Sequence, residues 1–343
     1  MEEVQGRAAT RTLRRFLVTG GAGFVGGNFV RLLLGTREGT EVTVFDGVPE
    51  PERSASLRDL PRLHPGRFRY VPGKITEEGA LAALFRENGP FDAVVHFAAR
   101  NPSGADEASP LEFPRVNTLG TAAVLEAARE AWGREGRRGV FLHLSSYEVY
   151  GSSADGLFRE DSPLNPSTPY AASKAAADTL TLAYHRTFGL DALVTRTTNI
   201  YGPFQSRDKL IPSVVRRIRE GRPVEVYGTG LQTRDWIHVD DHNRGVLLAL
   251  ERGLPGRVYH LGARCERTNL DVVRLAARAA LEELGRDPGE AERLVRFVPD
   301  RRAHDPRRAL DPSRAERELG FRPEVPFETG VGNTVRWILR EGW

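Results

Sequence analysis

Residues 15–27 read RFLVTGGAGFVGG, and this stretch decides the fold. A short apolar run ends at Gly20 and leads into a helical pattern that contains Gly23 and Gly26. Glycines at this spacing let the backbone turn tightly and approach a pyrophosphate at the amino end of the helix, where unpaired N–H groups favour anions. Glycine triplets also occur in ordinary loops, so the strand before and the helix after are needed for the interpretation. Together they predict the first strand, turn and helix of a dinucleotide-binding fold.

An acidic residue ends the second predicted strand, EVTVFD, at residues 41–46. Asp46 lies about 20 residues after Gly26, where a carboxylate accepts hydrogen bonds from the ribose hydroxyls of a dinucleotide. A carboxylate there repels a 2′-phosphate, which favours NAD over NADP as the cofactor. Arg53 argues the other way, but a single Arg in an Arg-rich loop is typical of a solvated surface.

Apolar runs bounded by glycine and proline alternate with helical patterns through the first half of the chain. This alternation is typical of a parallel sheet with helices on both faces. We predict a Rossmann-type doubly wound parallel sheet over residues 13–190 and a smaller C-terminal α/β substrate-binding domain over 191–343, with 234–262 returning to the first. The predicted strands are 15–20, 41–46, 68–73, 91–99, 140–146, 191–202 and 257–262, and the predicted helices are 78–87, 117–132, 170–187, 210–220, 241–252 and 268–285.

The chain carries 49 basic and 46 acidic side chains, well interspersed. A basic stripe is the usual mark of nucleic-acid binding, so this balance argues against DNA or RNA as a partner. The sequence shows no apolar signal core and no run of about 18 apolar residues, which predicts a cytoplasmic protein without a membrane partner. Cys265 is the single cysteine, so we expect no intrachain disulfide, no cysteine zinc cluster and no metal site.

YAASK at residues 170–174 places Tyr170 and Lys174 four residues apart, on one face of a predicted helix. The Lys ammonium can lower the pKa of the phenol from about 10 toward neutrality, which makes the phenolate a general base. Lys174 can also hold the nicotinamide ribose. Upstream, HLSSYEVYG at residues 143–151 supplies Ser146, whose hydroxyl can bind the same substrate hydroxyl that Tyr170 deprotonates. These residues predict hydride transfer from a secondary alcohol to NAD.

Longer stretches carry a family resemblance: TGGAGFVG, VVHFAA, SSYEVYG, SPLNPSTPYAASKAAAD, AYHRTFGL, TRTTNIYGPFQ, DKLIPSVV, VYGTGLQTRDWIHVDDH and DRRAHDPRRALD. On these stretches the chain resembles the extended short-chain dehydrogenase/reductases that act on nucleotide sugars, most closely the dTDP-glucose 4,6-dehydratases. The resemblance runs from about residue 15 to the C-terminus. It implies a hydro-lyase of deoxysugar biosynthesis, in which the C4 hydroxyl of a hexose is oxidised, water is eliminated across C5 and C6, and the hydride returns to C6.

The resemblance also implies a role for the residues that match family motifs. Glu148 is the base that removes the C5 proton, and Asn199 and Arg234 hold the diphosphate of a dTDP- or UDP-linked hexose. Long helices over 117–132 and 170–187 imply a homodimer built on a four-helix bundle. The implied cofactor residues are Gly20, Gly23, Phe24, Val25, Gly26, Asp46, Ile75, Phe97, Ala98, Ala99, Asn117, Tyr170 and Lys174. The other implied substrate residues are Arg100 and His304, with Lys209, Leu210, Ile211 and Tyr227 around the base.

Three places depart from the family pattern. Tyr147 stands where the family has the aspartate that protonates the leaving hydroxide. A tyrosine is protonated at pH 7 and can donate a proton, or it can simply pack against a neighbour. Arg100 and Asn101 begin a loop that in the family reads Glu-Ser-His-Val-Asp-Arg. Lys74 replaces an aspartate that binds the adenine amino group, so we expect the adenine to be held differently.

Because the sugar pocket is altered, two alternative functions stay open. SSYEVYG also fits the stretch found in nucleotide-sugar 4-epimerases, which need no C5 base. Glu148 is the reason that we rank the dehydratase first and the epimerase second. The other alternative is a catalytically inactive, NAD-bound regulatory protein, against which Tyr170 and Lys174 argue.

Overall fold

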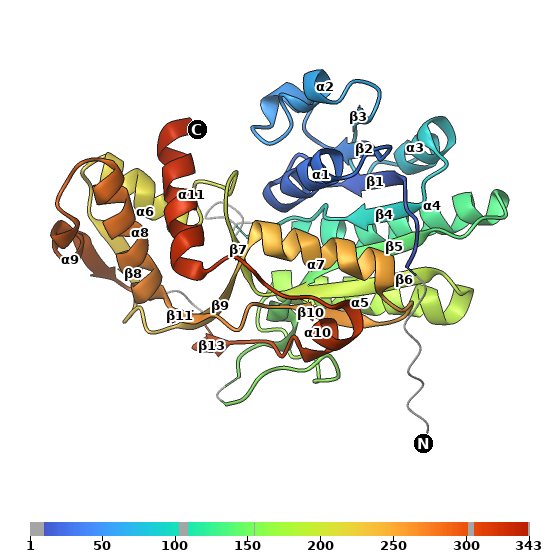
Figure 1. Ribbon diagram of the computed structural model, residues 1–343. Helices are drawn as coiled ribbons and strands as arrows, with labels where there is room; N and C mark the ends of the chain where they lie inside the picture. Colours follow the sequence, from blue (N-terminus) through green and yellow to red (C-terminus); the bar gives the residue numbers. More distant parts are fainter. Residues whose placement is uncertain (1–9, 103–108, 154, 301–304, 342–343) are drawn as a thin grey trace.

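The computed structural model describes residues 10–102, 109–153, 155–300 and 305–341, and its largest unit is a seven-stranded sheet (Figure 1). The strand order is β10-β6-β5-β4-β1-β2-β3, and all neighbouring strands are parallel. This is the Rossmann-type doubly wound arrangement that the alternating pattern predicts. The strands are β1 (Arg15–Thr19), β2 (Glu41–Asp46), β3 (Phe68–Pro72), β4 (Ala93–His96), β5 (Val140–Ser146), β6 (Asp191–Thr197) and β10 (Val258–Leu261).

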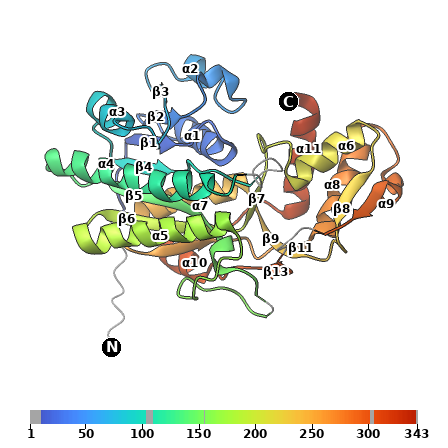
Figure 2. The ribbon, with the colours of Figure 1, turned by 180° about the vertical axis from the view of Figure 1, so that it is seen from behind.

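Helices cover both faces of this sheet because successive residues of a strand point to opposite sides. Phe16 and Val18 of β1 pack with α1 and α7 in one core, whereas Leu17 packs with α3 and α4 in another. Figure 2, seen from behind, shows α4 and α5 in front of the sheet. These elements are α1 (Phe24–Thr36), α2 (Leu60–Leu63), α3 (Ala80–Asn88), α4 (Gly120–Arg134), α5 (Pro169–Phe188) and α7 (Val239–Arg252), with short helical turns η1 (Pro51–Arg53) and η3 (Pro114–Leu119).

A further hydrophobic core lies beside the sheet, where α6, α8 and α11 pack together (Figure 1). Small sheets complete this part: β12 pairs with β8, and β9 pairs with β7, β11 and β13. Among the described helices, none has the length and apolar character needed to cross a membrane. The elements are α6 (Leu210–Arg219), α8 (Asn269–Glu283), α9 (Ala291–Leu294), α10 (Ser313–Leu319), α11 (Phe327–Glu341), η5 (Pro288–Glu290), β7 (Asn199–Tyr201), β8 (Val224–Tyr227), β9 (Thr233–His238), β11 (Glu266–Thr268), β12 (Val295–Val298) and β13 (Arg307–Arg308).

The stretch 191–202, predicted as one strand, is divided between two sheets. β6 ends at Thr197 in the large sheet, and β7 begins at Asn199 and pairs with β9. Both pieces are extended and follow each other closely, so the sequence pattern does not mark the change of partner. β13 also pairs with β9, with Arg308 opposite Arg234. This topology places Asn199, Arg234 and Arg308 on neighbouring strands.

We expect Leu33→Ala to lower the free energy of unfolding by about 2–5 kcal/mol, because the substitution leaves a cavity in a packed core. Leu33 of α1 is fully buried against the sheet. The matched control is Leu63→Ala, at a side chain that is 48% exposed, which should change the stability by about 0.5 kcal/mol or less. Urea denaturation measures both values, and equal losses would contradict the assignment of α1 to the core.

Candidate active site

The glycine-rich loop between β1 and α1 is shaped by two close backbone contacts. A Cβ on Gly20, whose φ is +73°, would lie 2.4 Å from the backbone nitrogen of Ala98. A Cβ on Gly26 would lie 2.4 Å from the carbonyl oxygen of Gly20. Neither position has room for a side chain. The loop therefore forms the tight cradle that a pyrophosphate requires, at the N-terminus of α1 where Gly23 is the N-cap.

Asp46 lies at the carboxyl end of β2, beside this cradle. Its carboxylate accepts hydrogen bonds from the backbone N–H of Ala22 at 3.0 Å and of Val48 at 3.1 Å. Burial raises the pKa of Asp46, and these backbone hydrogen bonds act in the opposite direction. The carboxylate is thus held in place beside the loop, and the cradle and the acceptor together fit a dinucleotide whose ribose hydroxyls Asp46 would bind.

The loop after β4 is held against α5 by Asn117. The side chain of Asn117 accepts a hydrogen bond from the Arg100 N–H at 2.7 Å and donates to the Arg100 carbonyl at 3.0 Å. Its amide also donates to Ser173 Oγ at 2.9 Å. Phe97, Ala98 and Ala99 precede Arg100 in the same segment. Asn117 therefore fixes the backbone of this segment beside the glycine loop.

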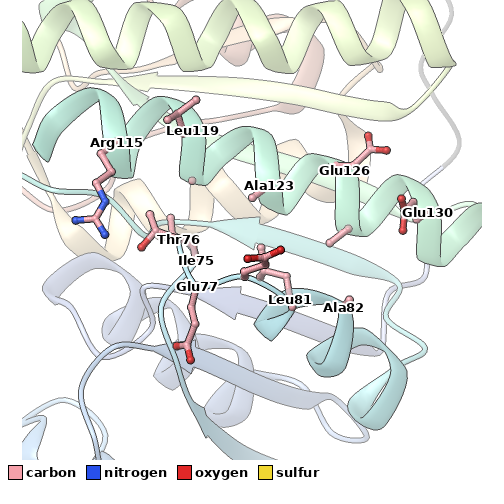
Figure 3. A pocket seen from close by; sticks show the side chains of 14 residues that line it. Ile75, Thr76, Glu77, Leu81, Ala82, Arg115, Leu119, Ala123, Glu126 and Glu130 are labelled. Carbon is pink, nitrogen blue, oxygen red and sulfur yellow. The ribbon is translucent and has the colours of Figure 1, made fainter. Parts of the chain in front are cut away.

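A groove of about 450 Å³ lies between α3 and α4 (Figure 3). Ile75, the one predicted cofactor residue in its lining, packs so closely on α4 that a Cβ on Gly120 would lie 2.6 Å from the Ile75 side chain. The groove carries Glu126 and Glu130 along α4, and the predicted catalytic residues are not part of its lining. The groove therefore does not coincide with the predicted catalytic cluster.

The predicted catalytic residues Ser146, Tyr147 and Glu148 lie where β5 ends and the helical turn η4 (Tyr147–Tyr150) begins. Ser146 is the N-cap of this turn, and its Oγ accepts a hydrogen bond from the Glu148 N–H at 3.2 Å. Tyr147 is 2% exposed and donates a hydrogen bond to Asn199 Oδ1 at 2.8 Å. Burial raises the pKa of Tyr147, so its phenol is protonated at neutral pH. Tyr147 is thus a buried proton donor beside a predicted diphosphate ligand.

Tyr170 and Lys174 lie in the first turns of α5, and both side chains are buried. Burial raises the pKa of the Tyr170 phenol, although a hydrogen bond with Ser146 lowers it. Lys174 Nζ donates a hydrogen bond to the Leu144 carbonyl at 2.6 Å, and burial lowers the pKa of Lys174 to about 8. Burial and the nearby charge of Glu148 raise the pKa of Tyr170 here, so its role as a general base stays a prediction. The structure does bring Ser146 and Tyr170 together.

Arg308 of β13 is a member of the cluster that the sequence did not single out. Its Nη1 forms an ion pair with Glu148 Oε2 at 3.1 Å, and its guanidinium carbon lies 5.7 Å from the centre of the Tyr147 ring. The residue is 6% exposed, as is typical of a charged group with fixed partners. The stretch DRRAHDPRRALD contains several arginines, and the ion pair in the folded structure identifies Arg308 as one that faces Glu148.

The predicted substrate residues that the structure describes include members of β9, α6 and β8. Arg234 is 5% exposed, and burial lowers its pKa. Lys209 begins α6, donates a hydrogen bond to the Pro102 carbonyl at 2.9 Å, and so joins α6 to the loop after β4. Leu210 and Ile211 follow it in α6, and Tyr227 ends β8. The prediction for His304 lies outside the described residues.

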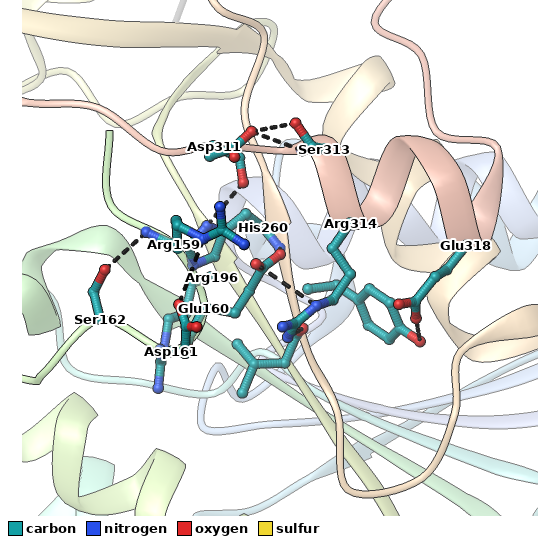
Figure 4. Close-up of polar contacts among 12 residues, drawn as sticks. Arg159, Glu160, Asp161, Ser162, Arg196, His260, Asp311, Ser313, Arg314 and Glu318 are labelled. Atoms are coloured by element: carbon teal, nitrogen blue, oxygen red, sulfur yellow. Dashed lines mark hydrogen bonds and ion pairs between the residues drawn. The ribbon is translucent and has the colours of Figure 1, made fainter. Parts of the chain in front are cut away.

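A buried polar cluster that includes Arg196 and His260 contacts η4 through Tyr150 (Figure 4). Tyr150 Oη forms a hydrogen bond with His260 Nε2 at 2.7 Å and also contacts Arg196, which pairs with Asp178 at 2.8 Å. Burial lowers the pKa of His260 to about 3, so the ring is neutral. His260 Nδ1 also lies 3.1 Å from the Asp311 carbonyl. These contacts anchor the hydroxyl of Tyr150, the last residue of η4, in the buried interior.

Comparison with known proteins shows the family to which this chain belongs. The model of the family described as GDP-mannose 4,6 dehydratase matches residues 17–334. The chain belongs to this family. A relative from Streptomyces niveus, a dTDP-glucose 4,6-dehydratase, is 42% identical over 327 residues, which are 94% of this chain and 92% of the relative.

Solved structures of related enzymes share the fold over nearly the whole chain. The crystal structure of DesIV, a dTDP-glucose 4,6-dehydratase from Streptomyces venezuelae with NAD and TYD bound, matches with a TM-score of 0.84 and 42% identity, covering 95% of this chain and 97% of that one. The UDP-glucose 4-epimerase of Thermus thermophilus, in complex with NAD, matches with a TM-score of 0.80 and 29% identity, covering 95% and 99%. Nucleotide-sugar 4,6-dehydratases and 4-epimerases, the two enzyme classes that the sequence leaves open, therefore both include members with this fold.

We expect Asp46→Ala to weaken NAD binding by about 10- to 100-fold, the usual effect of losing hydrogen bonds to a charged group. The preference for NAD over NADP should fall as well, because the charge that repels a 2′-phosphate is removed. Calorimetric titration of both cofactors measures this, with Glu50→Ala, a nearby exposed carboxylate, as the control. Tighter binding of NADP than of NAD by the unaltered protein would overturn this interpretation of Asp46.

Proposed function

We propose that this protein is an NAD-dependent nucleotide-sugar 4,6-dehydratase that acts on a dTDP- or UDP-linked hexose. The observation that carries the proposal is the position of Glu148, a carboxylate next to Ser146, Tyr147 and Tyr170 at the end of β5. An epimerase that acts at C4 needs no base for C5, whereas a dehydratase does. The names of the relatives, which are dTDP-glucose 4,6-dehydratases, support the same conclusion.

In the first step, Tyr170 and Ser146 act on the C4 hydroxyl. Ser146 holds the hydroxyl by a hydrogen bond, and Tyr170 accepts its proton. NAD, when bound, supplies the hydride acceptor for this oxidation and the hydride donor for the final reduction. The buried ammonium of Lys174 provides the positive charge that favours the phenolate once substrate is in place. The resulting ketone acidifies the neighbouring C5 proton.

In the second step, Glu148 removes the C5 proton and the bond between C6 and its hydroxyl breaks. Tyr147 donates its proton to the leaving hydroxide, which departs as water. The hydrogen bond from Tyr147 to Asn199 orients the phenol before the step. General acid catalysis of this kind contributes about 10²- to 10⁴-fold to a rate.

The remaining predicted site residues would bind the nucleotide part of the substrate. Arg234 and Asn199 lie on neighbouring strands and supply a cation and an amide for the diphosphate. We propose that four residues surround the nucleobase of the substrate: Lys209, Leu210, Ile211 and Tyr227. The division of the chain near residue 190 into a cofactor part and a sugar part stays a prediction.

The products formed from dTDP-glucose and UDP-glucose test the proposed reaction. We expect one of the two to yield a 4-keto-6-deoxy sugar, which has lost one water and is recognised by its mass. A product of unchanged mass with inverted C4 would establish the epimerase in place of the dehydratase. No reaction with either sugar would favour the inactive regulatory protein.

We expect Tyr147→Phe to slow the elimination by about 10²-fold or more while the oxidation at C4 continues. Reduced cofactor should then accumulate, which absorbance of the dihydronicotinamide measures. Glu148→Gln should give the same accumulation because the C5 proton stays in place, and Tyr170→Phe should give none. Dehydration by Tyr147→Phe at an unchanged rate would show that Tyr147 has a packing role.

We propose a homodimer formed through α4 and α5, which lie together on one face of the sheet (Figure 2). Exposed apolar side chains on this face include Leu119 and Phe188. Light scattering at micromolar concentration should give the mass of two chains, and Phe188→Glu should shift the mass toward one chain because a buried charge is costly. A single-chain mass for the unaltered protein would refute the bundle.

A further inference from the structure

Arg308 contacts both residues that the proposed elimination requires. It forms the ion pair with Glu148 at 3.1 Å, and it lies over the face of the Tyr147 ring. On its other side, Arg308 Nε donates a hydrogen bond to Asp305 Oδ2 at 2.8 Å. Asp305 in turn accepts a hydrogen bond from Ser167 Oγ at 3.1 Å, in the segment before α5. The guanidinium is therefore fixed from both sides.

The charges around Tyr147 come from three elements. Arg234 of β9 and Arg308 of β13 are cations that favour the phenolate, whereas Glu148 of η4 and Asp235 of β9 are carboxylates that oppose it. Burial is the largest influence and raises the pKa of Tyr147. A buried phenolate therefore needs one of these cations close to it.

We infer that Arg308 is the shared counter-ion of the elimination step, paired with the carboxylate of Glu148 before the step and with the phenolate of Tyr147 after it. This inference rests on the proposed function. It assigns a positioning and electrostatic role to a residue that neither the motifs nor the family resemblance singled out.

The proton balance of the step supports this role. The C5 proton moves to Glu148, which becomes neutral, and the electron pair of the C5–H bond forms the C5–C6 double bond. The C6–O bond breaks, and the proton of Tyr147 joins the leaving hydroxide to form water. One negative charge has then moved from Glu148 to Tyr147, and Arg308 lies beside both. No charge has to enter from solvent, and the guanidinium need not move, which is the property of a preorganised site.

The same geometry couples the two proton transfers. While Glu148 is ionised, its charge opposes ionisation of Tyr147. Protonation of Glu148 by the C5 hydrogen removes this opposition and releases Arg308 from its ion pair. Tyr147 therefore becomes a better acid at the moment when the leaving group needs a proton.

The test compares Arg308→Met, which keeps the length but removes the charge, with Arg308→Lys, which keeps the charge. In Arg308→Met holoenzyme with dTDP-glucose, we expect elimination to slow by about 10²-fold, the scale for loss of one charge-stabilising group. Reduced cofactor should accumulate, and the C5 hydrogen of the bound keto sugar should still exchange with deuterated water, because Glu148 remains as the base. Arg308→Lys should recover part of the elimination rate.

Arg307→Met is the matched control, since Arg307 is the neighbouring residue of β13 and pairs with Glu266 at 2.7 Å instead. It should leave the elimination rate unchanged. Equal losses of oxidation, C5 exchange and elimination in both Arg308 variants would indicate a structural role and overturn the inference. Dehydration by Arg308→Met at the unaltered rate would overturn this inference alone. Failure of the unaltered enzyme to dehydrate would overturn the proposed function and this inference with it.

Discussion

The close approach of Gly20 to the backbone of Ala98 determines how the site is assembled. The contact joins the loop after β1 to the segment after β4, two strands that are neighbours in the parallel sheet. Parallel strands end at the same edge, so the loops after β2 and β5 converge there as well. A side chain at Gly20 would separate these loops and displace the segment that Asn117 holds. The shape of the cofactor cradle thus depends on one backbone contact.

Much of this architecture could be predicted from the sequence because its signals are local. The glycine spacing, the carboxylate at the end of β2 and the Tyr170–Lys174 pair each lie within one turn or one strand. The position of Arg308 in the site could not be predicted from the sequence. Strand β13 is only two residues long, and it is placed by its pairing with β9. The burial of Tyr170, which raises the pKa of its phenol, could not be predicted either, because burial is a property of the folded chain and not of residue spacing.

The acidity of Tyr147 depends on the charged residues around it, which include Arg308. A tyrosine is a weaker acid than a carboxylic acid, and burial weakens it further. Two buried guanidinium groups, on Arg234 and Arg308, oppose that effect. Each arginine has its own anchor, the Thr233 carbonyl for Arg234 and Asp305 for Arg308. The guanidinium groups of Arg234 and Arg308 are therefore fixed by these partners before Tyr147 loses its proton.

The passage from β6 to β7 through Thr198 limits how this chain can change in length. Only Thr198 separates Asn199 from a strand of the large sheet, so the position of Asn199 beside Tyr147 is set by the register of that sheet. An inserted residue at Thr198 would turn the Asn199 side chain to the other face of β7. The turn at Gly136 has a φ of +59°, which favours glycine, but no packed neighbour among the described residues lies around it to restrict the length of the turn. Insertions and deletions in related sequences should therefore occur in such surface turns and not at the junction of the two sheets.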